Sequence, residues 1–130
     1  MTHPFRVALL VRKSLAESIF APEDLTFLAS FADFNPVDEL PDPITPEFMK
    51  KELADADACI TCWGTPSFSE DILACAPKLR LIAHAAGTVR TLVPKEYWSK
   101  CGRHVCSNAP VIAEDVAQTT LALILTSLKQ

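Results

Sequence analysis

Five short apolar runs recur along the chain, and each is separated from the next by a segment that carries helix-start signals. The runs cover residues 5–11, 34–37, 58–63, 79–84 and 104–107. Short continuous apolar runs are typical of strands that are buried on both faces. Strands that alternate with helices at intervals of roughly 20–30 residues predict βαβ units and a parallel sheet.

The segments between the runs begin with recognisable helix caps. Thr45, Pro46 and Glu47 supply a capping hydroxyl, a first-turn proline and a carboxylate near the positive end of the helix dipole, so a helix is expected from there to about residue 56. Ser14 and Glu17 have the spacing of a capping box. Further helices are expected over 22–31, 72–76, 94–102 and 112–129, the last with apolar residues at 113, 116, 117, 121, 124, 125 and 128.

These elements predict an α/β fold, a flavodoxin-like three-layer α/β/α sandwich with a five-stranded parallel sheet that ends in a long helix. Ligands of such sheets bind beyond the carboxyl ends of the strands. The prediction therefore directs attention to the loops that follow Val11, Trp63 and His84.

The composition argues against two classes of partner. The chain has 12 Lys and Arg against 16 Asp and Glu, a formal net charge of −4, whereas nucleic-acid binding needs a concentrated cationic surface. Lys and Arg occur at most as adjacent pairs, which argues against a membrane-surface patch. The most apolar segment, 116–128, is shorter than the roughly 20 residues that span a bilayer. We therefore predict a soluble, cytoplasmic protein that binds neither nucleic acid nor membrane.

Five cysteines lie within apolar runs, and their odd number argues against a disulfide framework. Buried free thiols in a reducing compartment are the expectation for Cys59, Cys62, Cys75, Cys101 and Cys106. The Cys59-x-x-Cys62 spacing also occurs in metal and redox sites. On a strand, however, residues three apart point to opposite faces, so no metal site is predicted.

Residues 56–87 carry the most informative pattern, ADACITCWGTPSFSEDILACAPKLRLIAHAAG. It reads as a strand, a T-P loop, a short helix ending in A-P-K-L, and a strand that runs into a small-residue loop. Residues 97–105 (YWSKCGRHV) and 113–118 (AEDVAQ) follow it. This series of motifs resembles the D-isomer-specific 2-hydroxyacid dehydrogenase family, which includes phosphoglycerate, glycerate and formate dehydrogenases. The resemblance covers nearly the whole chain and is strongest from residue 54 onward.

The resemblance implies a domain organisation. Residues 1–110 match the N-terminal portion of the family's substrate-binding (catalytic) domain, and residues 111–130 match its interdomain and dimerisation helix. The family reaction interconverts a 2-hydroxy acid and a 2-oxo acid with NAD or NADP. The cofactor domain of a relative follows the long helix, and none of the three glycines here, at 64, 87 and 102, forms a G-x-G-x-x-G fingerprint. No cofactor is therefore expected to bind this chain.

Two loops are implied as substrate contacts. In the family, backbone amides of the loop after the fourth strand hold the substrate carboxylate, and the matching residues are Ala86, Gly87 and Thr88. Small side chains let an anion approach successive N–H groups, although such a loop also permits tight packing. The second substrate-facing loop of the family matches Trp63, Gly64 and Thr65, with a core position as the alternative for the tryptophan.

No catalytic residue is expected in the chain. The resemblance implies that the family's acid–base histidine, its paired carboxylate and its substrate-binding arginine belong to segments outside these residues. His84 takes a position where many relatives have an arginine, so we predict an orienting residue or a histidine that is satisfied at the strand end. The family's usual D-N after the loop reads Arg90-Thr91, its asparagine before the long helix is Ile112, and its glutamate is Gln118.

The leading hypothesis is thus a truncated D-2-hydroxyacid dehydrogenase, inactive alone, that supplies the carboxylate-binding loop and forms a homodimer. A receiver domain is disfavoured because Arg12, Lys13 and Trp63 stand where it needs acidic residues, and a flavodoxin because only Ser14 follows the first strand as a phosphate-binding hydroxyl. A stand-alone small-acid-binding or self-associating module remains open, because helix 112–129 exposes apolar surface unless another chain covers it.

Overall fold

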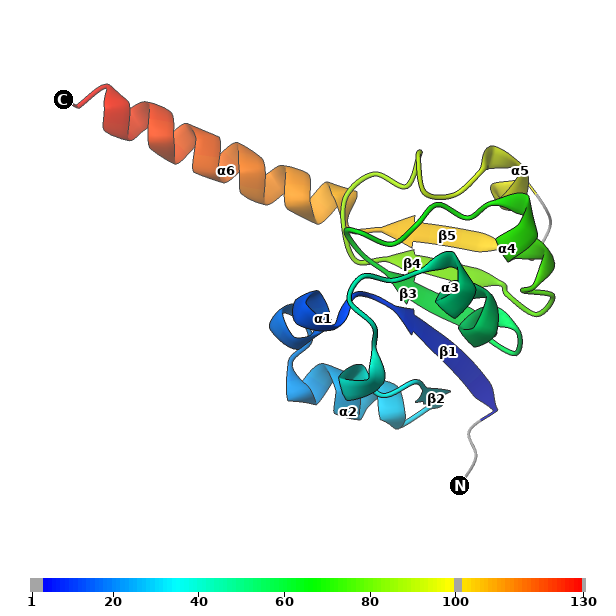
Figure 1. Ribbon diagram of the computed structural model, residues 1–130. Helices are drawn as coiled ribbons and strands as arrows, with labels where there is room; N and C mark the ends of the chain where they lie inside the picture. The colour runs from blue at the N-terminus through cyan, green and yellow to red at the C-terminus, as the bar shows by residue number, and fades with distance from the viewer. Residues whose placement is uncertain (1–3, 100–101, 130) are drawn as a thin grey trace.

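The computed structural model describes residues 4–99 and 102–129. Its centre is a single sheet of five parallel strands in the order β2-β1-β3-β4-β5. The strands are β1 (Phe5–Leu10), β2 (Ala32–Phe34), β3 (Ala58–Thr61), β4 (Leu81–His84) and β5 (His104–Ser107). Helices lie on both faces of the sheet, which confirms the flavodoxin-like α/β/α prediction (Figure 1).

The connections between the strands contain most of the helices. They are α1 (Lys13–Ile19), α2 (Pro22–Ala29), the 3-10 helix η1 (Val37–Glu39), α3 (Pro46–Leu53), α4 (Glu70–Ala74), α5 (Lys95–Trp98) and α6 (Ala109–Ser127). Thr45 caps α3 as predicted, and Ser69 caps α4, because their hydroxyls accept from the backbone N–H of Phe48 and Ile72.

One face of the sheet is fully packed, and we call it the packed face. There α3, α4 and α5 cover the side of β3 and β4 that carries Cys59 and Ile82. The cluster is sealed: its largest fully buried side chains include Tyr97, Met49 and Leu53. Burial of this kind contributes about 1.5–3 kcal/mol for each large apolar side chain.

The opposite face, which we call the open face, is covered only in part. Helices α1 and α2 pack over β1 and β2, where Leu9, Val11 and Ala16 are fully buried. Over β4 and β5 the cover ends: Leu81 is 36% exposed, and His104 and Cys106 are exposed. The side chains of this face are therefore divided between a real core and a surface.

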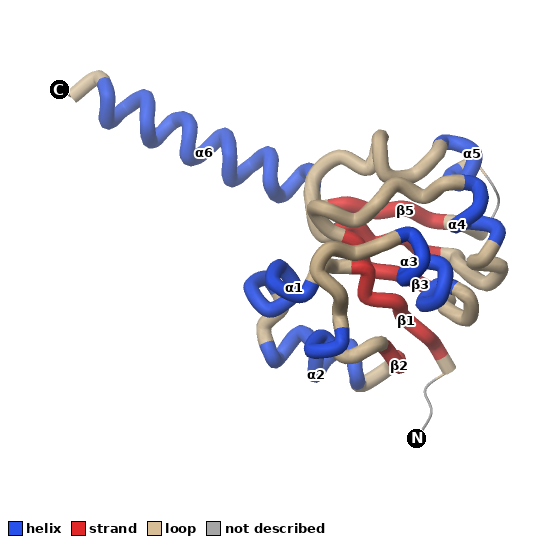
Figure 2. Tube along the Cα trace, viewed as in Figure 1, coloured by secondary structure: helices blue, strands red, loops and turns tan. Residues whose placement is uncertain are grey.

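Helix α6 extends away from the rest of the molecule (Figures 1 and 2). It has no buried residue, and seven large apolar side chains are exposed on or just beyond it. Asn108 alone connects β5 to α6, and its N–H donates to the carbonyls of His84 and Ala86. By length and composition alone, α6 is apolar enough to cross a bilayer, with a mean hydropathy of 1.2 over 18 residues.

Two predicted element positions and one predicted capping box differ from the structure in an instructive way. The second strand occupies Ala32–Phe34 and not 34–37, since Pro36 has no N–H to donate to a ladder. The last helix begins at Ala109 and not near 112, because a proline is tolerated in the first turn. Ser14 does not form a capping box with Glu17: it is already inside α1, and its N–H and hydroxyl both donate to the carboxylate of Asp42.

Candidate functional site

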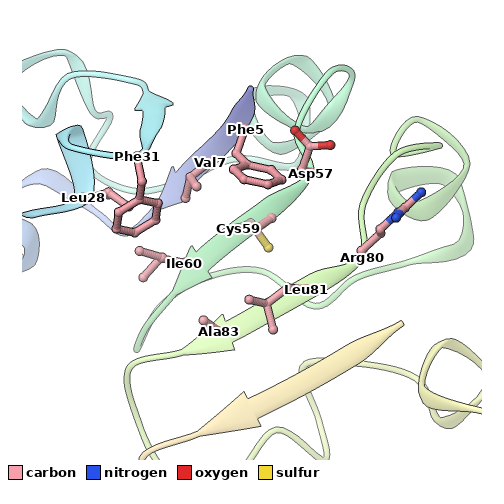
Figure 3. A pocket seen from close by; sticks show the side chains of 11 residues that line it. Phe5, Val7, Leu28, Phe31, Asp57, Cys59, Ile60, Arg80, Leu81 and Ala83 are labelled. Carbon is pink, nitrogen blue, oxygen red and sulfur yellow. The ribbon is translucent and has the colours of Figure 1, made fainter. Parts of the chain in front are cut away.

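Two of the hollows in the described part of the chain have very different characters. The first is a groove of about 480 Å³ on the open face, drawn in Figure 3. Side chains of β1, β3 and β4 form its floor, and Leu28 and Phe31 stand at one side. Asp57 and Arg80, which precede β3 and β4, are its charged residues. Because its lining is almost entirely apolar and no polar groups converge in it, this groove is suited to packing and not to chemistry.

The second hollow lies beyond the carboxyl ends of β3 and β4, where ligands of parallel sheets bind. Its volume is about 270 Å³. Residues from the two predicted loops line it together with a strand-end histidine: Cys62, Trp63, Gly64, Thr65, Ser67, His84, Gly87, Thr88, Thr91 and Leu92. We call it the carboxyl-edge pocket. The structure thus brings together five of the six residues that the sequence singled out.

The loop after β3 is held by a compact turn. The N–H of Thr65 donates to the carbonyl of Cys62 at 3.2 Å, and the Thr65 hydroxyl both accepts from the Cys62 N–H and donates to the carbonyl of Leu10. Gly64 has a φ of +86°, a conformation that an L side chain rarely adopts. This turn ties the loop to the end of β1 and leaves Trp63, 57% exposed, as a wall of the pocket and not as a core residue.

The loop after β4 presents backbone donors. None of the N–H groups of Ala86, Gly87 and Thr88 has an acceptor within residues 4–99 and 102–129. Gly87 does not have a positive φ, and a Cβ placed on it meets no atom within 4 Å. Its backbone needs no glycine, so the missing side chain leaves open space at the pocket.

Two hydrogen bonds connect the segments that follow β3 and β4. The hydroxyl of Ser67 donates to the carbonyl of Thr91 at 2.7 Å, and the N–H of Phe68 donates to the carbonyl of Leu92 at 2.8 Å. Ala86 is the exception among the predicted residues. Its side chain is fully buried with Cys62 in the core of the open face and does not line the pocket.

His84 and Thr61 form a pair that sequence reasoning missed. The β3–β4 register places them opposite each other at the strand ends, and Thr61 Oγ1 lies 2.9 Å from His84 Nδ1. Both are buried, and burial lowers the pKa of His84 from its ordinary value of 6.5, which favours the neutral ring. A signal was available in their positions, because each is the last polar residue of its predicted strand.

The cysteines divide between the faces. Cys59 lies in the core of the packed face and Cys62 in that of the open face, as the strand geometry predicted, and burial raises the pKa of both thiols. The expectation of burial was wrong for Cys75 and Cys106, which are exposed because one ends a short surface helix and the other lies on the uncovered edge strand. Cys101 lies outside the described residues. No cluster of metal-binding side chains occurs in the described part of the chain.

The pocket does not fit a dinucleotide. A dinucleotide cradle is a glycine-rich turn that passes directly from a strand into a helix N-terminus. Here Gly64 and Gly87 are separated from the next helices by further loop residues, and Gly102 precedes a strand. The carboxyl-edge pocket instead offers amide donors, hydroxyls and one aromatic wall within a volume suited to a small anion.

No family model and no curated protein matches the chain. Among solved structures, the PH0520 protein of Pyrococcus horikoshii OT3 is 24% identical with a TM-score of 0.69, over 93% of this chain and 32% of its own. A phosphoglycerate oxidoreductase from Rhizobium etli is 24% identical (TM-score 0.64), over 92% and 36%. A D-lactate dehydrogenase from Aquifex aeolicus, complexed with NAD and lactic acid, is 21% identical (TM-score 0.54), over 93% and 33%. The chain shares their fold and spans about a third of their length.

Proposed function

We propose that this chain is the front portion of the substrate-binding domain of a D-2-hydroxyacid dehydrogenase, and that its part in the reaction is to hold the carboxylate of a small 2-hydroxy or 2-oxo acid. Two structural neighbours are oxidoreductases by name, and one was solved with NAD and lactic acid. The motif order of residues 56–118 supports the same family.

One observation carries the proposal. The loops after β3 and β4, which lie more than 20 residues apart in the chain, line one small pocket whose free donors are backbone N–H groups. Successive unpaired amides attract an anion with partial positive charge, and the Arg12 side chain beside Gly64 adds a cation near the pocket. Trp63 adds an apolar wall against which the carbon chain of a small acid packs.

The chain's own residues bind and orient. The amides of Gly87 and Thr88, with that of Ala86 behind them, hold the carboxylate, and the turn at Gly64 and Thr65 fixes the opposite wall. NAD or NADP, bound by a separate domain, supplies hydride transfer in the intact enzyme. The resemblance places the family's acid–base histidine and substrate-binding arginine in segments outside these residues, so the 130 residues are expected to be inactive by themselves.

The exposed apolar surfaces support the partial-domain interpretation. A soluble domain rarely exposes large contiguous apolar patches, yet here both the open-face groove and α6 lack cover. In the family, a returning C-terminal segment completes the substrate domain and the long helix contacts the cofactor domain and a second subunit. We propose that these elements cover the two surfaces in the intact enzyme, a cytoplasmic homodimer without membrane or nucleic-acid partners.

Calorimetric titration of the 130-residue chain tests the proposal. Glyoxylate should bind with a dissociation constant on the order of millimolar, as expected of a small ligand that gains about half of its final contacts, and NADH should not bind. Gly87→Val should abolish acid binding without loss of stability, since its side chain projects into open space. Tight NADH binding, or glyoxylate binding that Gly87→Val leaves unchanged, would contradict the assignment.

The same titration separates a binding module from an enzyme fragment. A longer form that includes a cofactor domain should oxidise a 2-hydroxy acid with NAD or NADP. The chain could bind acid while no extended form of it turns over any 2-hydroxy acid. In that case the stand-alone acid-binding module is the better description.

A further inference from the structure

The Thr61–His84 pair is placed so that the backbone alone determines which atoms meet. The two residues are register partners at the carboxyl ends of adjacent strands. Thr61 has no exposed area and His84 is 7% exposed, so both side chains are packed where they meet. Their 2.9 Å contact is therefore a fixed feature of the site.

The contact determines which ring nitrogen carries the proton. Thr61 Oγ1 has no other hydrogen-bond partner in the described part of the chain. If His84 Nδ1 were the donor, the threonine O–H would be buried without an acceptor, which costs about 1–3 kcal/mol. The threonine therefore donates to Nδ1, and a neutral ring then carries its proton on Nε2.

The second ring nitrogen is open to the pocket. His84 Nε2 has no hydrogen-bond partner among residues 4–99 and 102–129. In that part of the chain, Arg6 Nε is the only side-chain nitrogen or oxygen that is both fully buried and without a hydrogen-bond partner, so His84 Nε2 is not fully buried. His84 Nε2 is thus accessible, and the surface that His84 contributes is a wall of the carboxyl-edge pocket. A donor on this nitrogen is therefore available to a ligand in the pocket that His84 lines.

We propose that His84 is a specificity-determining ligand contact: Thr61 holds its ring as the Nε2–H tautomer, and Nε2–H donates to an oxygen of the small acid bound at the loop of residues 86–88. The inference rests on the proposed function and names a contact within that site. Thr61 is a positioning residue that acts through the histidine. The contact is a hydrogen bond and involves no proton transfer, and burial, which lowers the pKa of His84, favours the neutral ring in the free site.

Two experiments on the same protein test the inference, with glyoxylate as the probe. Long-range proton–nitrogen NMR correlations of the unaltered chain report the tautomer of His84, assigned by comparison with His84→Gln. Glyoxylate titrations then compare His84→Phe, which keeps a ring without a donor, with His84→Gln, which keeps an amide donor near the position of Nε2. The pair Thr61→Val and Thr61→Ser removes and restores the hydroxyl.

The expected results are a proton on Nε2, about tenfold weaker glyoxylate binding in His84→Phe, and retention within about threefold in His84→Gln, the ratios typical of one hydrogen bond to a charged group. Thr61→Val should populate both tautomers, and Thr61→Ser should restore the original one. A proton on Nδ1, or equal affinity of the unaltered chain and His84→Phe, overturns the inference and leaves the proposed function standing. An unaltered chain that does not bind glyoxylate defeats both. If His84→Phe does not fold, the tautomer of the unaltered chain decides.

Discussion

The two faces of the sheet use the same strands in opposite ways. On the packed face, α3, α4 and α5 seal a core whose members have almost no exposed area. On the open face, α1 and α2 cover much of β1 and β2, and an apolar groove remains over β3, β4 and the start of β1. Neighbouring residues of one strand, Ile82 and Leu81, therefore have 0% and 36% exposure. The difference shows which half of the sheet is covered on both faces by the described helices and which half exposes apolar surface.

This contrast gives the largest expected effect. Ile82→Ala should lower the free energy of unfolding by about 3 kcal/mol, because it leaves a cavity in a sealed core. Leu81→Ala, one residue earlier on the other face, should cost at most about 1 kcal/mol, because its site is partly hydrated already. Urea denaturation of the matched pair measures both. Equal losses would mean that the open face is as well packed as the other.

The buried thiol of the packed face makes stability depend on alkaline pH. The pKa of Cys59 is raised by burial, so above pH 9 the unfolded chain loses a proton that the folded chain retains, and stability falls as the pH rises. The expected slope is about 1.4 kcal/mol per pH unit for one thiol. Cys62 adds to it, and Tyr97, whose pKa is raised to about 12, adds above pH 10.

Single substitutions of cysteines on the two faces are the control for the alkaline effect. Cys59→Ala should remove one thiol's share of the slope, and Cys62→Ala should remove the share of the buried thiol on the open face. Unfolding curves between pH 8 and pH 10.5 are the measurement. A slope that Cys59→Ala does not alter would show that this thiol ionises in the folded chain.

Uncovered apolar surface should produce self-association. We expect a dimer with a dissociation constant on the order of tens of micromolar, typical of a weak interface, through α6 or the open-face groove. Leu121→Lys should weaken it about tenfold if one anchor of the interface is lost, and Thr119→Lys, at a polar position of the same helix, should have little effect. Sedimentation velocity reports the outcome. A chain that stays monomeric at hundreds of micromolar would contradict this view of α6.

The smallest effect is expected at mildly acidic pH. Burial lowers the pKa of His84 in the folded chain, so the unfolded chain takes up the proton first as the pH falls below 6.5. Stability that His84 contributes above that pH is therefore lost progressively between 6.5 and the lower folded-state pKa. His84→Gln should flatten this part of the unfolding profile. A profile with the same slope in both proteins would show that other groups cause it.

The sequence predicted the sheet and the loops because their signals are local. Apolar runs, and the caps at Thr45 and Ser69, specify strands and helix starts without long-range information. The Asp42 contact that replaces the Ser14 capping box joins residues 28 apart, so spacing does not reveal it. The same holds for the Thr61–His84 pair, which depends on the register of two strands. Cys106 and α6 are exposed because no other described segment packs over them. A local sequence pattern does not reveal such a lack of cover.

An amide NMR titration with glyoxylate tests the central claim most directly, because it reports both hollows at once. We expect saturable shifts at Thr65, Gly87 and Thr88 around the carboxyl-edge pocket, and none at Leu81 or Phe31 in the apolar groove. Gly87→Val should remove those shifts while the remaining spectrum stays that of a folded chain. Shifts confined to the groove, or unchanged shifts in Gly87→Val, would show that the loops after β3 and β4 do not hold the acid.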